Sequence, residues 1–132
     1  AAISAPFVGV ENYNNLQTKA QILNKMGKSD EAEKVMETAM EKGTVLQIHN
    51  YGRQLIAQGK KEKALEVFKK NAKMHKDTWP VNYGLARGYS ALGDYKKAMQ
   101  YLEKAYDLAP QQVNKDRVQA NMEKLKKGED IN

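Results

Sequence analysis

The chain has 132 residues, of which 41% are hydrophobic and 29% are charged, and it contains no cysteine. This length suffices for one domain with a continuous core, and the lack of cysteine excludes disulfides and thiolate metal sites. The net charge of +6 permits acidic partners without requiring nucleic acid, for which a clustered basic stripe is typical.

The first ten residues, AAISAPFVGV, show no hydrophobic period and are predicted to form a lead-in linker, residues 1–10. They lack the basic region and the long apolar stretch of a signal peptide, and the chain does not begin with Met. We therefore expect a mature form or a piece of a longer protein. Phe7 and Val8 are candidates to pack on the first helix. No apolar run approaches about 18 residues, so no transmembrane helix is expected.

From residue 11 onward, apolar residues recur at steps of three, four and seven, which is typical of amphipathic helices. Four helices are predicted at about 11–26, 29–42, 45–58 and 60–76, and two more lie within 79–110 on either side of Gly93 and Asp94. Glycines end these helices, since they adopt the left-handed backbone readily. The residues predicted to cap the helices that follow are Ser29, Thr44, Thr78 and Asp94.

The helices repeat as pairs. Gly59 and Gly93 are 34 residues apart, as are Ala64 and Ala98, and a shift of 32 relates the first pair to the second. Three copies of one hairpin are therefore predicted, at residues 11–43, 44–78 and 79–110. Small residues recur where the two helices of a copy would approach closely: Ala20, Gly52 and Ala86 on first helices, and Ala32, Ala64 and Ala98 on second helices.

Residues 111–127 are predicted to form a capping helix, because a stack of hairpins needs a closing helix with one polar face. Its narrow apolar stripe consists of Val113, Val118, Met122 and Leu125. Gly128 ends this helix, and residues 128–132 are predicted to be a tail that frays. Trp79 is expected at the junction between the second and third copies, at least partly buried.

The third copy, WPVNYGLARGYSALGDYKKAMQYLEKAYDLAP, resembles the tetratricopeptide repeat (TPR). The matching positions are Leu85, Ala86, Tyr89, Gly93, Tyr95, Ala98, Leu102, Ala105 and Pro110. The departures are Asn82, where the family favours Trp, and Lys19, Asn71 and Lys76 in the earlier copies. This resemblance implies an all-α, right-handed α–α superhelix of seven helices: three helix-turn-helix repeats and a C-terminal capping helix.

A second likeness is carried by the run NYGRQLIAQGKKEKALEVFKKNAKMHKDTWPVNYGLARGYSALGDYKKAM and the ending KKGEDIN. These segments are similar to the C-terminal repeat region of an uncharacterised family of exported bacterial proteins with an upstream β-rich domain of unknown function. The likeness implies that the chain is the C-terminal part of a longer, exported or periplasmic protein. It implies no activity.

No catalytic, cofactor-binding or metal-binding residue is assigned. The sequence lacks a nucleophile elbow, a Walker loop and a zinc-protease motif. The two histidines, His49 and His75, lie on different predicted helices, and a metal site would need carboxylates that converge on them. The chain is therefore predicted not to be an enzyme.

The candidate binding site is the inner wall of the stack, which first helices line in the resembled fold. Residues four apart share a helix face, so each copy contributes one rung. The rungs consist of Gln17 and Gln21, of His49 and Arg53, and of Tyr83 and Arg87; Asn24 and Ser90 extend this groove and Asn50 flanks it. Guanidinium groups bind carboxylates in a bidentate manner, so the groove is predicted to prefer an acidic or extended peptide.

The sequence thus predicts a non-catalytic protein-protein interaction module with a polar, basic concave groove for a peptide segment or a partner domain. One alternative is an intramolecular scaffold that docks the missing upstream domain. Another is binding of RNA or another anionic polymer, which is disfavoured because Gln17, His49 and Tyr83 form no regular base-reading code. A further alternative is that these residues are merely solvated.

Overall fold

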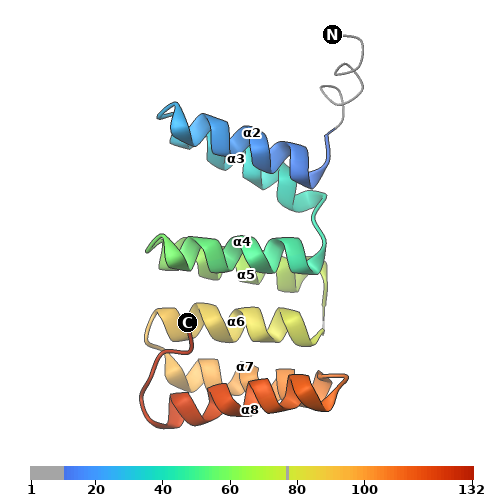
Figure 1. Cartoon of the computed structure of the whole chain (residues 1–132), viewed down its shortest axis with the longest axis vertical. Helices are drawn as coiled ribbons and strands as arrows, with labels where there is room; N and C mark the ends of the chain where they lie inside the picture. Colours follow the sequence, from blue (N-terminus) through green and yellow to red (C-terminus); the bar gives the residue numbers. More distant parts are fainter. Residues whose placement is uncertain (1–10, 77) are drawn as a thin grey trace. The chain divides into compact units, whose positions relative to one another are not determined.

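The computed structural model describes residues 11–76 and 78–132 (Figure 1). The predicted lead-in linker, with Phe7 and Val8, lies outside these residues. Seven helices lie within the described ranges and pack as pairs, which confirms the predicted all-α class. They are α2 (Tyr13–Lys25), α3 (Ser29–Glu41), α4 (Val45–Ala57), α5 (Lys61–Met74), α6 (Trp79–Ala91), α7 (Tyr95–Leu108) and α8 (Gln112–Lys126).

The described residues divide into two compact units, one that ends at Gln47 and one that begins at Ile48. In the first unit, α2 and α3 bury the predicted small and apolar faces, including Leu16, Ala20 and Ala32. Asn12 caps α2 by accepting a hydrogen bond from the Asn15 amide at 2.9 Å. The predicted cap of α3 is wrong, because Ser29 is itself the first helical residue and no side chain caps this helix.

Thr44 caps α4, as predicted. The Gln47 amide donates to Thr44 Oγ1 at 3.2 Å, and the Thr44 amide donates to Gln47 Oε1 at 2.9 Å. This reciprocal pair is a capping box, which satisfies two amides that the first turn of a helix leaves without partners. The start of α4 is thereby held in place one turn before His49.

Phe68 of α5 fixes the spacing of the helices in the second unit. Its side chain is 1% exposed and fills a slot between glycines of α4 and α6. A β-carbon added at Gly52 would lie 2.5 Å from the ring, and one added at Gly84 would lie 2.6 Å from it. The glycines therefore allow α4 and α6 to approach the ring closely, which brings their polar side chains near each other.

The core of α6, α7 and α8 contains Ala86, Ala98, Leu102, Ala105 and Val118, each of which is fully buried. Thr78 and Asp94 cap α6 and α7 as predicted, by accepting hydrogen bonds from the amides of Val81 and Lys97. Trp79 is partly buried, as expected, and packs edge-on against Tyr83 with ring centroids 5.8 Å apart. It packs against the core that α6, α7 and α8 form.

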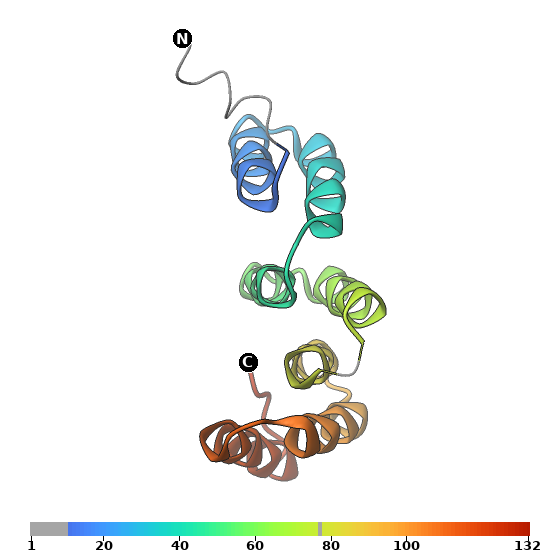
Figure 2. The same ribbon diagram turned by 90° about the vertical axis from the view of Figure 1, so that its right-hand side faces the viewer.

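The prediction that residues 128–132 fray is wrong. Figure 2 shows this segment rising from the end of α8 to the side of α6 that faces away from α7. Gly128 has a φ of +75°, a conformation that glycine adopts without steric cost, and there the chain turns back toward α6. Ile131 then reaches the hydrophobic core, where its side chain is 6% exposed.

Candidate functional site

The candidate site in the second unit is built on one face of α6. Tyr83, Arg87 and Ser90 are spaced by four and three residues and therefore share this face. Helix α8 and the segment after it lie on the same side of α6 (Figure 2). The structure thus brings the three predicted α6 residues together, but in surroundings that differ from an open groove.

Tyr83 and Ser90 are buried, which corrects the prediction that they are exposed in a groove. Tyr83 is 3% exposed because α8 covers it, and its hydroxyl accepts a hydrogen bond from the side chain of Asn121. Ser90 is 1% exposed because the segment after α8 covers it. Sequence periodicity places these residues on one face of α6 but does not show which element covers that face.

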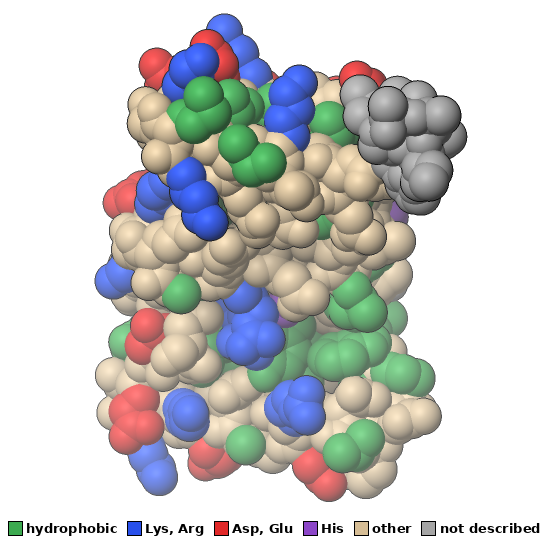
Figure 3. Space-filling model, turned by 45° about the horizontal axis from the view of Figure 1, so that its top comes forward, with side chains coloured by type: hydrophobic (Ala, Val, Ile, Leu, Met, Phe, Trp, Pro, Cys, Tyr) green, Lys and Arg blue, Asp and Glu red, His purple; other side chains and the backbone are tan. Residues whose placement is uncertain are grey.

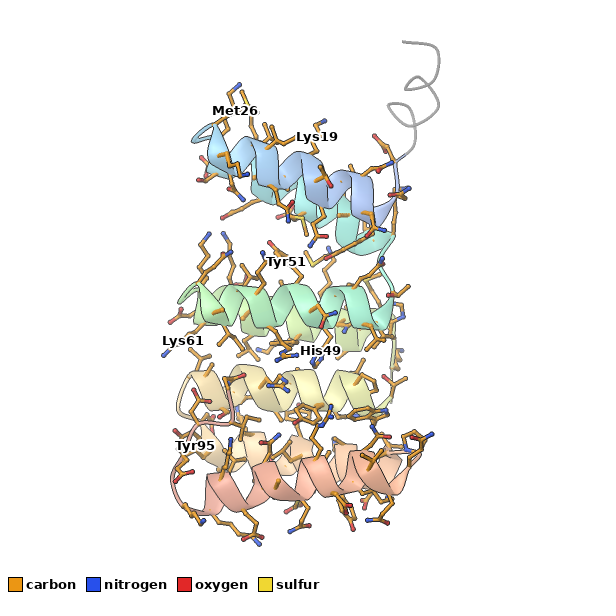
Figure 4. The ribbon with its side chains drawn as sticks, in the orientation of Figure 1. Lys19, Met26, His49, Tyr51, Lys61 and Tyr95 are labelled. Carbon is orange, nitrogen blue, oxygen red and sulfur yellow. The ribbon has the colours of Figure 1, made fainter. Side chains whose placement is uncertain are left out.

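His49 is also buried, so its predicted role as an exposed contact is wrong. Its ring packs edge-on against Phe68 and Tyr83, with centroid distances of 5.5 and 6.3 Å. Figure 4 shows the labelled His49 in the layer between α4 and α6. Burial and, after it, the charges of Arg87 and Arg53 lower the pKa of His49 to about 4, against the opposing effect of a hydrogen bond with the Pro80 backbone. The imidazole is therefore neutral at pH 7.

Arg87 is half-buried and held against an aromatic ring. Its guanidinium carbon lies 4.6 Å from the centroid of the Tyr83 ring, within the range of a cation–π contact. Burial lowers the pKa of Arg87, Tyr83 acts in the opposite direction, and Arg53 and Arg117 lower it further. Its Nε is buried and has no hydrogen-bond partner among the described residues. The side chain is thus fixed in position while part of its donor capacity is unused.

The charges of two exposed arginines, Arg53 on α4 and Arg117 on α8, act on Arg87 of α6, and we call these three residues the arginine cluster. They are close enough for the charges of Arg53 and Arg117 to lower the pKa of Arg87. Within the described residues, none of the three forms an ion pair. On the surface drawn in Figure 3, a small patch of His atoms lies beside Lys or Arg side chains and a hydrophobic area. The cluster is therefore a basic surface in which no guanidinium group of the described residues is in an ion pair.

Arg117 and Asp130 are functional candidates that the sequence pattern does not single out. Arg117 lies on the polar side of the capping helix, and its proximity to Arg87 depends on how α8 packs. Asp130 accepts a 2.6 Å hydrogen bond from Ser90 Oγ. For Asp130 the sequence offers one signal, the Asp-Ile-Asn pattern at residues 130–132. An isolated aliphatic residue in a polar segment can mark a packing contact.

The remaining predicted groove residues have polar, accessible positions. Asn50 and Arg53 are exposed on α4. In the first unit, Gln17 is half-buried on α2, whereas Gln21 and Asn24 are exposed on the same helix. Their stacking with the residues of the second unit into one groove stays a prediction.

The described part of the chain contains no group of three or more His, Asp or Glu side chains placed to hold a metal ion. Residues 11–76 and 78–132 also include no helix whose length and apolar character would let it cross a membrane.

Helices that pack as antiparallel pairs are typical of tetratricopeptide repeats. In agreement, residues 13–41 match the tetratricopeptide repeat family. Residues 53–129 match the family described as Regulator of microtubule dynamics protein 1-3. This match covers more than half of the chain, so the chain belongs to that family. Both families consist of non-catalytic scaffold or regulatory modules. No curated protein matches the chain. The expected likeness to exported bacterial proteins with an upstream β-rich domain finds no support in these matches.

Proposed function

We propose that the chain is a non-catalytic protein-interaction module that binds an acidic segment of a partner protein at the arginine cluster. The observation that carries this proposal is that the charges of Arg53 and Arg117 act on Arg87 while none of the three arginines forms an ion pair within the described residues. A carboxylate that enters the cluster would satisfy a guanidinium group that now lacks an acidic partner. The tetratricopeptide match supports a protein partner in particular.

The site is arranged in advance for such a ligand. Tyr83 supports the Arg87 guanidinium, and Asn121 of α8 in turn holds the Tyr83 hydroxyl. A fixed side chain loses little conformational freedom on binding, so more of the interaction energy appears as affinity. The partial burial of Arg87 also weakens the competition from water. An arginine in such a site can form a bidentate pair with a carboxylate.

The family description suggests the process in which the partner acts. Because the matched family is described as Regulator of microtubule dynamics protein 1-3, we propose that the acidic partner segment belongs to a protein of the microtubule system. Co-sedimentation of the purified chain with assembled microtubules tests this part of the proposal. A chain that stays in the supernatant at every microtubule concentration would argue against direct binding and leave the acidic-segment proposal to its own test.

That test compares two double variants that remove the same charge. Arg53→Gln with Arg117→Gln changes two exposed members of the arginine cluster, whereas Lys124→Gln with Lys127→Gln changes two exposed residues elsewhere on or just after α8. In calorimetric titrations with an extended polyglutamate peptide, we expect the arginine pair to weaken binding about tenfold and the lysine pair to weaken it much less. Equal losses in the two variants would show that only net charge matters and would reject the site.

RNA binding is the second candidate, and the stacked rings of Tyr89 and Tyr101 bear on it. The rings of Tyr89 and Tyr101 stack on each other with centroids 5.6 Å apart, and the ammonium groups of Lys69 and Lys97 lie over Tyr89. These ring faces are therefore already in contact with other side chains, whereas single-stranded RNA needs open aromatic faces. Filter binding at two salt concentrations distinguishes the candidates, since RNA affinity falls steeply with salt.

Docking of an upstream domain is the intramolecular form of the same interaction. It would use the same arginine cluster and an acidic segment of the longer protein. In that case the longer protein would not bind the polyglutamate peptide that this chain binds.

A further inference from the structure

The segment after α8 is held on α6 by contacts of the kind that a bound peptide makes. Ser90 Oγ donates to Asp130 Oδ1 at 2.6 Å and accepts from the Ile131 amide at 3.0 Å. The Asn132 side chain donates to the Arg87 carbonyl at 2.9 Å. The Ser90 hydroxyl thus binds both the Asp130 carboxylate and the main-chain amide of the next residue. The backbone of α6 binds the side chain of Asn132.

The same segment places one apolar side chain in the core. Ile131 is 6% exposed, whereas its neighbours Asp130 and Asn132 are exposed. Asp130 Oδ1 also accepts hydrogen bonds from the amide and the side chain of Asn132, at 3.1 and 2.8 Å. The segment is therefore a compact unit with one buried aliphatic anchor between two polar contacts. We call residues 129–132 the docked tail.

Electrostatics favour an acidic residue at this position. Burial raises the pKa of Asp130, but the hydrogen bonds from Ser90 and Asn132 and the charge of Lys61 outweigh it and hold this pKa below its usual value. Asp130 in turn acts on Arg87 by stabilising its charged form. The docked tail therefore lies beside the arginine cluster, and its Asp130 carboxylate interacts electrostatically with Arg87.

Few contacts hold the docked tail, and it is joined to α8 at Gly128. One buried side chain and a small set of hydrogen bonds are typical of a segment that opens locally while the rest of the domain stays folded. Ser90 has a 1% exposed side chain in the closed state and would present its hydroxyl once the tail leaves. The released site would then offer a hydroxyl, a main-chain carbonyl and a slot for one aliphatic side chain.

We infer that the docked tail occupies, within its own chain, a binding site for a partner segment in which an acidic residue is followed by an aliphatic one. The partner reaches this site by displacing the tail. This inference rests on the proposed function, because it extends the acidic-segment surface from the arginine cluster along α6 to Ser90. It adds a specificity element, the aliphatic anchor, that the arginine cluster lacks.

The direct test supplies the tail as a separate molecule. The probe is a fluorescent peptide of residues 126–132 with an amidated end, added to the full chain carrying Asp130→Ala and Ile131→Ser. A tethered tail competes at an effective concentration of about millimolar, so we expect the variant to bind the peptide about tenfold or more tightly than the unaltered chain does. Adding Ser90→Ala to the variant should abolish this gain.

The matched control is Glu129→Ala, which removes a carboxylate from the same tail but from a residue whose side chain is exposed. It should bind the peptide as weakly as the unaltered chain. Circular dichroism establishes that the variants are folded. A folded Asp130→Ala and Ile131→Ser variant that gains no peptide binding would overturn the inference, because the tail would then be only a structural cover.

A second measurement works on the unaltered chain and needs no variant to fold. Nuclear magnetic resonance follows the methyl and amide signals of Ile131 during titration with a peptide that contains both a glutamate run and an Asp-Ile-Asn sequence. Displacement predicts that both signals move to the positions of an unstructured residue. Signals that stay unchanged while the peptide binds would overturn the inference.

The two proposals can fail separately. One outcome is that the variant with Arg53→Gln and Arg117→Gln binds polyglutamate normally while the tail peptide binds the released site. Binding of acidic segments at the arginine cluster is then rejected, and the Ser90 site stands. If those arginine variants lose polyglutamate binding but the Asp130→Ala and Ile131→Ser variant gains nothing, the Ser90 site is wrong and the proposed function stands.

Discussion

At the scale of single residues, His49 shows how burial changes the role of a side chain. Its position one turn before Arg53 is typical of an exposed contact, yet the side chain is 9% exposed between Phe68 and Tyr83. A ring in this position contributes packing and adds no positive charge at pH 7, since burial lowers its pKa to about 4. The positive charge beside it therefore comes from the arginine cluster and not from His49.

The lowered pKa of His49 predicts a loss of stability in acid. The unfolded chain takes up a proton near the usual pKa of 6.5, whereas the folded chain does so only near 4. Between these values the unfolded state binds more protons, so the free energy of unfolding falls as the pH decreases from about 6.5 to about 4. The full contribution is at most about 3.5 kcal/mol, because each pKa unit corresponds to about 1.4 kcal/mol.

Urea unfolding at several pH values measures this effect, with His49→Gln as the comparison. The variant lacks the titrating group but keeps a polar side chain, so its stability should depend less on pH over the same range. A pH dependence equal to that of the unaltered chain would mean that other groups cause the acid loss.

At the scale of helices, the Phe68 slot links three elements. The ring lies close to Gly52 of α4 and to Gly84 and Gly88 of α6, where added β-carbons would be 2.5, 2.6 and 3.2 Å from its atoms. Because glycines crowd the ring from two helices, it has little room to move away from either one. This slot sets the approach of α4 to α6, and with it the distance between Arg53 and Arg87.

We therefore expect Gly52→Ala to destabilise the chain although alanine is the better helix former. The gain in helix propensity is about 1 kcal/mol, whereas overpacking a core typically costs about 1–3 kcal/mol. Because an added β-carbon would lie 2.5 Å from the Phe68 ring, the cost should fall toward the upper end of this range, so the net loss in chemical unfolding should be about 1–2 kcal/mol. Asn50→Ala, at an exposed position of the same helix, is the control and should change stability only slightly. A stabilised Gly52→Ala variant would show that the ring can move.

The helices could be predicted from the sequence, whereas the candidate site could be predicted only in part. Periodicity and caps are local properties, so Thr44, Thr78 and Asp94 were correctly assigned as caps from a few neighbouring residues. The burial of Tyr83 and Ser90 depends instead on where α8 and the docked tail pack. Those contacts join residues about 40 positions apart, and no repeat period encodes them.

At the scale of the whole molecule, net charge should govern how fast an acidic partner arrives. The chain has 22 Lys and Arg residues against 16 Asp and Glu residues, a net charge of +6. A basic protein attracts an acidic peptide over distances comparable to the screening length, which falls from about 10 Å at 0.1 M salt to about 3 Å at 1 M. Overall charge thus speeds encounter, while the arginine cluster would determine how long the complex lasts.

Stopped-flow measurements with polyglutamate peptide can separate these contributions. Raising the salt concentration from about 0.05 to about 0.5 M should slow association strongly and change dissociation less. Lys124→Gln with Lys127→Gln should slow association slightly and leave dissociation unchanged, because these residues lie outside the cluster. Arg53→Gln with Arg117→Gln should slow association by a similar amount and also speed dissociation, since it removes direct contacts. Equal dissociation rates for the two double variants would mean that the peptide binds the general basic surface.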